Sequence, residues 1–342
     1  MQVGKLTPAA LQQLIFDQLG KRRPEVVLRG TFGEDSAALN LEGDLCVMST
    51  DPITGAAKHA GWLAVHVSCN DVAANGAEPV AVLLTLLLPA GADLGLVQEI
   101  MTDAEKAARE VRVEIVGGHT ELTAAVNQPI ISTTVIGRVA AERLATSSSI
   151  QPGDALVATK YVGLEGTAIL AADFPAITKP LLGAALWEAA CAFTQQISIV
   201  PEARIAAACG VRAMHDATEG GVAGAAYEMA GAAGLGFAIE EKALPIHPAT
   251  KLLAEHLQFD PLRLISSGTL LLATPVPEIL LAELAAHDIP ASVIGHFHAS
   301  GNKRLYKANG MSEPISPPES DELWRLQASL LASKSSEGSH SI

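Results

Sequence analysis

Residues 67–79 read Val-Ser-Cys-Asn-Asp-Val-Ala-Ala-Asn-Gly-Ala-Glu-Pro. Apolar residues recur at helical spacing through this stretch, and a glycine after Asn75 is typical of a helix end, so we expect a helix over 61–76. Asp71 is unusual inside that helix, because the short side chain of aspartate competes for backbone hydrogen bonds. Asp71 therefore either serves a function or lies on a solvated helix face, and the helix alone does not decide between the two.

Three further segments place acidic or polar residues beside a glycine-rich turn or at the end of an apolar run. They are Gly33-Glu34-Asp35-Ser36-Ala37-Ala38, Ser49-Thr50-Asp51 and Gly117-Gly118-His119-Thr120-Glu121. A carboxylate at the end of a buried strand faces the crevice where α/β sheets bind ligands. A single such aspartate is more often a turn or helix cap, but Asp35, Asp51 and Asp71 together exceed what one turn needs. Converging carboxylates are suited to holding metal ions against a polyphosphate.

The Gly117-Gly118 pair is expected to end a strand over 113–116 and to form a turn. Paired glycines let the backbone approach a ligand and present N–H groups to phosphate oxygens. A plain strand-to-loop turn is the alternative. His119 alone is more often a structural residue than a ligand, and Thr120 could bind a metal or a ribose.

A second glycine pair follows the sequence His215-Asp216-Ala217-Thr218-Glu219. Glycines that open a helix create an anion site, whereas acidic residues there also complement the helix dipole in a purely structural way. Both interpretations of Asp216 stay open. The sequence contains no P-loop, no Gly-x-Gly-x-x-Gly after a strand and no Gly-x-Ser-x-Gly elbow.

The amino-acid composition indicates the number of domains, the type of core and the classes of partner. The 342 residues predict two domains, and 49% hydrophobic with only 4% aromatic residues predicts a large aliphatic core. A net charge of −14 without a basic run argues against nucleic acid and against an anionic membrane as partners. Nucleotides remain compatible, because bound cations bridge carboxylates to phosphates.

The four cysteines are widely spaced and form no Cys-x-x-Cys pair, so we expect reduced thiols in a cytoplasmic protein. The first residues lack the apolar segment of a signal peptide. The apolar run 80–89 is too short to cross a bilayer.

The hydrophobic pattern predicts an α/β (α+β) protein with two domains: an N-terminal domain over 1–147, a C-terminal domain over 148–312 and a tail over 313–342. In the first domain we expect strands at 37–41, 45–49, 80–88, 113–116 and 128–139, with helices at 7–19, 61–76 and 94–111. In the second we expect strands at 155–160, 236–240, 268–274 and 291–297, with helices at 165–173, 182–197, 201–208 and 277–287 and one after Gly221. The tail should contain a short helix over 321–332 and a disordered end.

Taken in order, the motifs at 33–38, 49–51, 70–79, 117–120 and 216–221 resemble those of the aminoimidazole ribonucleotide synthetase-like superfamily. That superfamily includes selenophosphate synthetase, thiamine monophosphate kinase and the hydrogenase maturation protein that dehydrates a thiocarboxamide. The resemblance covers residues 30–310, and Ile265-Ser266-Ser267-Gly268-Thr269-Leu270 and Asp260-Pro261-Leu262 are most similar to the hydrogenase maturation branch.

The resemblance implies a homodimer in which the N-terminal domains form a barrel at the interface, with a C-terminal α/β domain packed behind. It implies ATP and Mg2+ as cofactors, with Asp35, Asp51 and Asp71 as metal ligands. Cofactor binding would fall to Gly33, Asn70, Gly117, Gly118, His119 and Thr120. The catalytic residues would be Asp51, Asp71 and Asp216. The implied chemistry is ATP-dependent phosphoryl transfer to a small molecule or an amide-type oxygen.

The sequence departs from the hydrogenase maturation pattern at its end. That protein carries its substrate on a C-terminal cysteine, whereas the last cysteine here is Cys209 and the sequence ends Ser-His-Ser-Ile. The acceptor is therefore not predicted. Two alternatives to an enzyme are a maturation protein that binds a partner, with Trp324 and Leu326 in an exposed tail, and a non-catalytic homologue that binds nucleotide without turnover.

Overall fold

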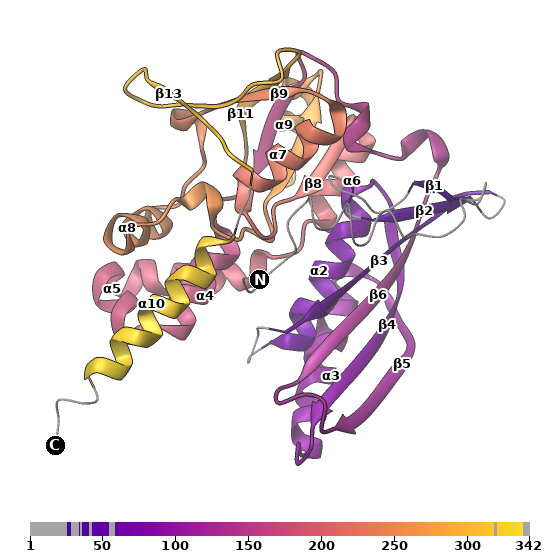
Figure 1. Ribbon diagram of the computed structural model, residues 1–342. Coiled ribbons are helices and arrows are strands. Elements are labelled where there is room, and N and C mark those ends of the chain that lie inside the picture. The colour runs from indigo at the N-terminus through magenta and orange to yellow at the C-terminus, as the bar shows by residue number, and fades with distance from the viewer. Residues whose placement is uncertain are drawn as a thin grey trace.

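The computed structural model describes residues 26–28, 34, 36–40, 43–54, 59–317 and 320–337, with side chains up to residue 331. Two mixed sheets, each with its own helices, form the two halves of the molecule (Figure 1). The expected helix at 7–19, the residues Gly33 and Asp35 and the last five residues lie outside the described residues.

The first sheet has six described strands in the order β1-β2-β3-β6-β4-β5. The strands are β1 (Val26–Leu28), β2 (Ala37–Asn40), β3 (Leu45–Ile53), β4 (Glu78–Pro89), β5 (Glu114–Thr123) and β6 (Ile130–Val139). Neighbouring strands are antiparallel except for the parallel pair β4 and β5. The central strands alternate between buried and less buried residues, as expected for a sheet with one covered face.

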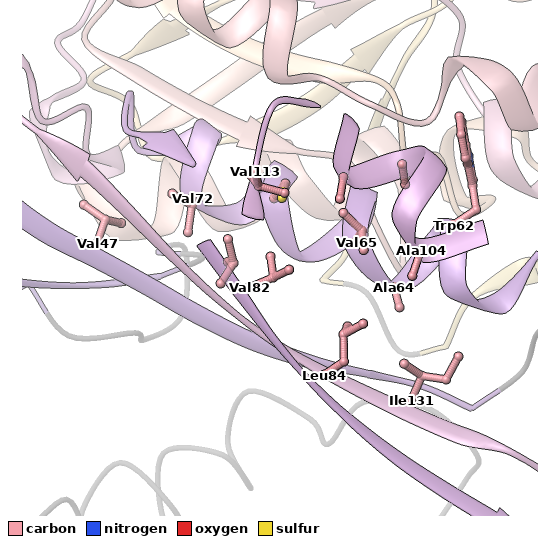
Figure 2. Packing of buried hydrophobic residues seen from close by; sticks show 14 of the residues in the cluster. Val47, Trp62, Ala64, Val65, Val72, Val82, Leu84, Ala104, Val113 and Ile131 are labelled. Carbon is pink, nitrogen blue, oxygen red and sulfur yellow. The ribbon is translucent and has the colours of Figure 1, made fainter. Parts of the chain in front are cut away.

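Two helices, α2 (Ala60–Ala74) and α3 (Leu94–Val111), cover the same face of this sheet (Figure 1). Figure 2 shows Val65 and Val72 of α2 pointing toward Val82 and Leu84 of β4. The core is made of small aliphatic side chains, as the low aromatic content predicts. Nearly every residue of α2 is buried, because α2 also packs against the second domain. This burial rejects the interpretation of Asp71 as part of a solvated helix face.

Two strands extend beyond the predicted ends. β3 continues to Ile53, so Asp51 lies inside a strand rather than directly after one. Pro52 is tolerated there because β2 pairs with β3 only as far as Met48, which leaves one edge of the later residues free of a described partner. β5 continues to Thr123, so the expected turn at Gly117-Gly118 is wrong: both glycines belong to a strand paired with β4.

The second sheet has seven strands in the order β13-β12-β9-β11-β7-β10-β8. The strands are β7 (Ala155–Thr159), β8 (Ala213–Asp216), β9 (Gly236–Glu240), β10 (Leu270–Thr274), β11 (Ala291–His298), β12 (Lys303–Tyr306) and β13 (Ser312–Pro314). The sequence did not predict β1, β8, β12 or β13. Each has only three or four residues, too few for a periodic pattern to stand out.

The helices of the second half are α4 (Leu164–Asp173), α5 (Pro175–Ala192), α6 (Val200–Ala208), α7 (Gly221–Ala233), α8 (Pro248–Leu257), α9 (Pro277–Ala285) and α10 (Glu322–Glu337). Helix α8 was not predicted. Helix α10 lies beside α4 (Figure 1), and its Leu323, Leu326 and Leu330 are buried in a cluster with residues of α4, α5 and α8. Leu326 is only 2% exposed, so it does not belong to an exposed interaction element.

Within the described residues, no single helix has the length and apolar composition needed to cross a bilayer. The bent pair of α4 with the segment Pro175–Gln196 passes the test only jointly. All four cysteines are free thiols, as predicted, and burial together with the nearby Asp71 charge raises the pKa of Cys69.

Candidate functional site

Asp71 lies at the contact between α2 and β3. The Ser49 hydroxyl donates a hydrogen bond of 2.5 Å to the Asp71 carboxylate, and Asp71 is only 6% exposed. Asp51 is two residues beyond Ser49, so its side chain leaves the same face of the strand, about 7 Å further along. The structure therefore gathers the segments around residues 49–51 and 70–71, which the sequence treated as separate motifs.

The segment before β2 reaches the C-terminal end of α2, one helical turn beyond Asp71. The Ser36 hydroxyl donates a short hydrogen bond to the side-chain oxygen of Asn75, whose amide nitrogen donates to the Ala145 carbonyl at 2.9 Å. The neighbouring carboxylate of Glu34 accepts hydrogen bonds from the Ser147 and Ser148 backbone and from Asn75. Burial raises the pKa of Glu34, and these hydrogen bonds and the nearby His215 oppose the rise.

His215 comes from the second glycine-rich motif, which places that motif at the same domain junction. It ends β8 together with Asp216, and its Nε2 lies 3.2 Å from the Glu228 carboxylate. Four of the five sequence motifs therefore meet around α2: the residues before β2, the end of β3, α2 itself and the end of β8.

Asn70 has a different partner from the one we predicted. Its amide nitrogen donates to the Ile197 carbonyl and its amide oxygen accepts from the Ile199 amide, both at 2.9 Å. Both groups of this fully buried side chain are thus engaged by the backbone of the second domain. The structure gives Asn70 an interdomain role, and its cofactor-binding role stays a prediction.

The Gly117–Thr120 segment lies apart from Asp71. Asp51, Thr133, Leu84 and Gly118 form one transverse row across β3, β6, β4 and β5. Three strand spacings separate the ends of this row, or roughly 14 Å. A Cβ on Gly118 would lie 1.8 Å from the Leu84 carbonyl oxygen, so tight packing against β4 explains this glycine without any ligand.

His119 and Thr120 are exposed on the outer strand β5. His119 Nε2 lies 3.2 Å from the Glu121 carboxylate. Their predicted contact with a phosphate therefore remains a prediction, because they sit at the far end of the sheet from Asp71.

The second domain holds an acidic group that the sequence barely signalled. Glu165, in the first turn of α4, has an enclosed Oε2 with no hydrogen-bond partner. Burial raises its pKa to about 7, and the nearby Asp321 and Asp216 add to the rise while Ser267 opposes it. Asp321 accepts backbone hydrogen bonds from Gly220, Ile265 and Leu323, yet burial raises its pKa to about 6. Asp216, predicted to be catalytic, thus has Glu165 as an acidic neighbour.

The residues at the α2–β3 contact fit a magnesium ion. Among the residues that the structure describes, no three or more His, Cys, Asp or Glu side chains gather as a metal-binding group. Mg2+ does not need such a cage, because it is usually held by one or two carboxylates together with substrate phosphates and water. The enclosed Asp71 carboxylate, and Asp51 on the same face of β3 as Ser49, supply that number of carboxylates.

The fold and these motifs define the class of protein. Residues 33–139 match the model of the AIR synthase related protein N-terminal domain, and residues 151–307 match the C-terminal domain. The chain belongs to this family. Its two-domain mixed fold and its place near the hydrogenase maturation branch agree with the sequence-based expectation.

Individual relatives and solved structures show which members of the family this chain resembles. The carbamoyl dehydratase HypE of Rhodobacter capsulatus is 29% identical over 321 residues, covering 91% of each chain. A HypE–HypF complex provides a solved structure with a TM-score of 0.76 at 22% identity, covering 91% of this chain and 100% of that one. A HypE in complex with ATP has a TM-score of 0.69 at 24% identity, covering 94% of this chain and 97% of that one. These two structures show the shared fold.

Proposed function

We propose that this chain is an ATP- and Mg2+-dependent enzyme that activates an amide-type oxygen by phosphoryl transfer, as a carbamoyl dehydratase would. The single observation that supports this most is the hydrogen bond that joins Ser49 to the enclosed Asp71, with Asp51 on the same face. Membership of a family with carbamoyl dehydratase relatives supports the reaction class.

Asp51 and Asp71 would hold the metal ion, with Asp35 as a predicted third ligand outside the described residues. When bound, magnesium would neutralise the charge of the triphosphate, which is the main demand of phosphoryl transfer. The γ-phosphoryl group would pass to the acceptor oxygen, which would later leave on phosphate as the acceptor loses its protons. The buried position of Asp71 between a sheet and a helix would keep its carboxylate oriented and partly shielded from water.

The test compares Asp51→Asn and Asp71→Asn with Asp44→Asn, an exposed carboxylate just before the other end of β3. Isothermal titration calorimetry should show Mg2+-dependent ATP binding by the wild type and by Asp44→Asn. The two site variants should lose it while keeping wild-type far-ultraviolet circular dichroism. Unchanged ATP affinity in both folded site variants would contradict the proposal. Phosphate release with candidate amides then separates an enzyme from a homologue that binds nucleotide without turnover.

We also propose a homodimer formed through the uncovered face of the first sheet. Val80 and Leu83 of β4 are 45% and 38% exposed there, and β5 leaves its outer edge without a described strand partner. Unpaired strands with exposed apolar residues favour pairing with another chain. A second subunit would cover these residues and extend the sheet.

A protein partner is a second proposal, supported by the shared fold with the HypE of a HypE–HypF complex. The interaction surface would not be the apolar face of α10, since that face is buried in the chain's own core. Deleting residues 332–342 leaves these buried leucines in place, and we expect capture of the partner to stay unchanged. Loss of capture would show that the end of the chain takes part.

A further inference from the structure

A four-residue segment of the second domain is held from two sides by two buried side chains. Residues 196–199 run from the last residue of the short helix η4 (Phe193–Gln196) to the residue before α6. The carbonyls of Gln196 and Ser198 accept hydrogen bonds of 2.8 and 2.7 Å from the Lys160 ammonium group. Ile197 and Ile199, the alternate residues, bond to Asn70. Even-numbered residues of the segment thus bond to the second domain and odd-numbered ones to the first.

All three hydrogen-bond donors of the Lys160 ammonium group have partners, which hold this side chain in place. Its Nζ lies 2.5 Å from the Glu202 carboxylate, and the two side chains are 9% and 4% exposed. An ammonium group has three donors, and two carbonyls and one carboxylate match that number. The segment also has little room to shift, because a Cβ on Gly268 would meet the Gln196 carbonyl oxygen at 2.5 Å.

The residue of the first domain that makes this contact is next in sequence to the proposed metal ligand. Asn70 precedes Asp71 in α2, and nearby Leu63 and Val67 pack against a cluster that contains Phe193 and Ile197. A helix that is anchored at Asn70 cannot rotate about its axis without breaking the two bonds to Ile197 and Ile199. That rotation is the motion that would move the Asp71 carboxylate away from Ser49.

We propose that Lys160 is a positioning residue, which acts through residues 196–199 and Asn70 to fix the orientation of the Asp71 carboxylate across the domain interface. Lys160 touches no reacting group. This inference rests on the proposed magnesium role of Asp71, and it adds a second-domain residue on which that role depends. Groups that orient metal ligands from behind commonly change metal affinity by about 10- to 100-fold when they are removed.

The test uses the double variant Lys160→Met with Glu202→Met, because a single change would leave one buried charge without its partner. The matched control is Lys307→Met with Glu313→Met, which removes another Lys–Glu pair, of 2.9 Å, at the β12–β13 edge of the second sheet. Both pairs are replaced by the same residues in the same domain, so the control accounts for the change of charge and composition; the control pair is the more exposed of the two, at 32% and 53%.

The first readout is hydrogen exchange without nucleotide. We expect the amides of Ile199 and of residues 66–74 to exchange roughly tenfold faster in the Lys160 and Glu202 variant than in the control, which corresponds to about 1.4 kcal/mol. Equal exchange in the two variants would overturn the coupling. Because this readout needs no ligand, it stands even where the wild type binds no Mg2+-ATP and the proposed function fails.

The second readout separates positioning from general damage. With Mg2+ titrated at fixed ATP, the Lys160 and Glu202 variant should need about tenfold more Mg2+ than the control. Its affinity for ATP in EDTA should match that of the wild type. An unchanged Mg2+ midpoint, or an equal loss of affinity with and without Mg2+, would overturn the positioning role of Lys160.

Discussion

The Ser49 hydroxyl donates a hydrogen bond of 2.5 Å to the carboxylate of Asp71, which lies 22 residues later in the chain, and this bond joins a strand to a helix. A hydroxyl that donates to a carboxylate restricts the rotation of that carboxylate. Ser49 thus orients the group that we propose as a metal ligand.

Ser49→Ala should therefore weaken Mg2+-dependent ATP binding by about 3- to 10-fold, less than Asp71→Asn, because it removes an orienting bond and not a ligand. Calorimetry at several Mg2+ concentrations measures the difference. Ser68→Ala, which removes a long hydrogen bond of 3.4 Å from the same helix to the Thr133 carbonyl, is the matched control. Equal losses from the two alanine variants would count against an orienting role for Ser49.

Because the imidazole of His66 is buried, we expect the free energy of unfolding to fall in acid. Burial, aided by the nearby Lys160 charge, lowers the pKa of this imidazole from 6.5 to about 4. The unfolded chain therefore takes up a proton more readily than the folded one between these values. The stabilising contribution is complete above pH 6.5 and is lost as the pH falls toward 4, by up to about 3 kcal/mol.

His66→Leu should remove this loss. Urea unfolding at a series of pH values from 7.5 to 4.5 should show the wild type losing free energy of unfolding faster than the variant. The Glu110 carboxylate, 3.7 Å from Nε2 and half exposed, faces the ring from α3 but is beyond hydrogen-bond distance. Parallel curves for the two proteins would contradict the lowered pKa.

Glu165 predicts the opposite trend with pH. Its pKa is raised from 4.5 to about 7, so the folded state holds a proton that the unfolded chain has already released. The resulting destabilisation is absent below pH 4.5 and grows as the pH rises toward 7. Glu165→Gln should therefore raise the free energy of unfolding by roughly 1–3 kcal/mol at pH 8 and by much less at pH 5.

A variant of Asp321 is the comparison for the unfolding measurement on Glu165→Gln. Its pKa is also raised, but its carboxylate accepts three backbone hydrogen bonds. Asn has only one acceptor oxygen, so Asp321→Asn should destabilise the protein at both pH values. A Glu165→Gln variant that is less stable than the wild type at pH 8 would show that the carboxylate is held by bonds that outweigh its burial.

Gly118 predicts a packing defect. Gly117 and Gly118 have φ values of 155° and 145°, so alanine suffers a similar backbone cost at either position. Only at Gly118 would the added Cβ meet a backbone oxygen at 1.8 Å; at Gly117 its neighbour is the Leu83 side chain at 3.6 Å. Gly118→Ala should be the more destabilising by about 2 kcal/mol or more in thermal unfolding. Equal stabilities of the Gly117→Ala and Gly118→Ala variants would show that contact with Leu84 is not what requires glycine at position 118.

A charge introduced at Leu83 tests the proposed dimer interface. It points away from the α2–α3 face of β4 and is 38% exposed. Leu83→Glu would place a charge in the proposed subunit interface, and light scattering should then report a monomer. Leu94→Glu, at the 84% exposed start of α3, makes the same change outside that interface and should remain dimeric. A dimeric Leu83→Glu protein would show that this face is not the interface.

The site was only partly predictable from local patterns. Asp51 and Asp71 were chosen as candidates because carboxylates stood out against apolar runs, and the structure brings their two segments together. The expected turn at Gly118 was wrong, because a glycine required by a neighbouring strand has the same sequence signal as one in a turn that approaches a ligand; its cofactor-binding role stays a prediction. Lys160 and Glu202 carried no signal at all, since a lysine after a strand and a glutamate in a helix are ordinary until both are buried together.

The order of the motifs indicated the family by resemblance, and the alternation of apolar runs predicted the two-domain α/β plan. The plan follows from short-range periodicity, and Asp71 was singled out by the residue types that its own segment displays. Only the tertiary structure decided that Ser49 bonds to Asp71, that Asn70 joins the two domains and that Gly118 lies three strands away from Asp51. These relationships depend on strand order and on contacts up to 129 residues apart, which no local pattern encodes.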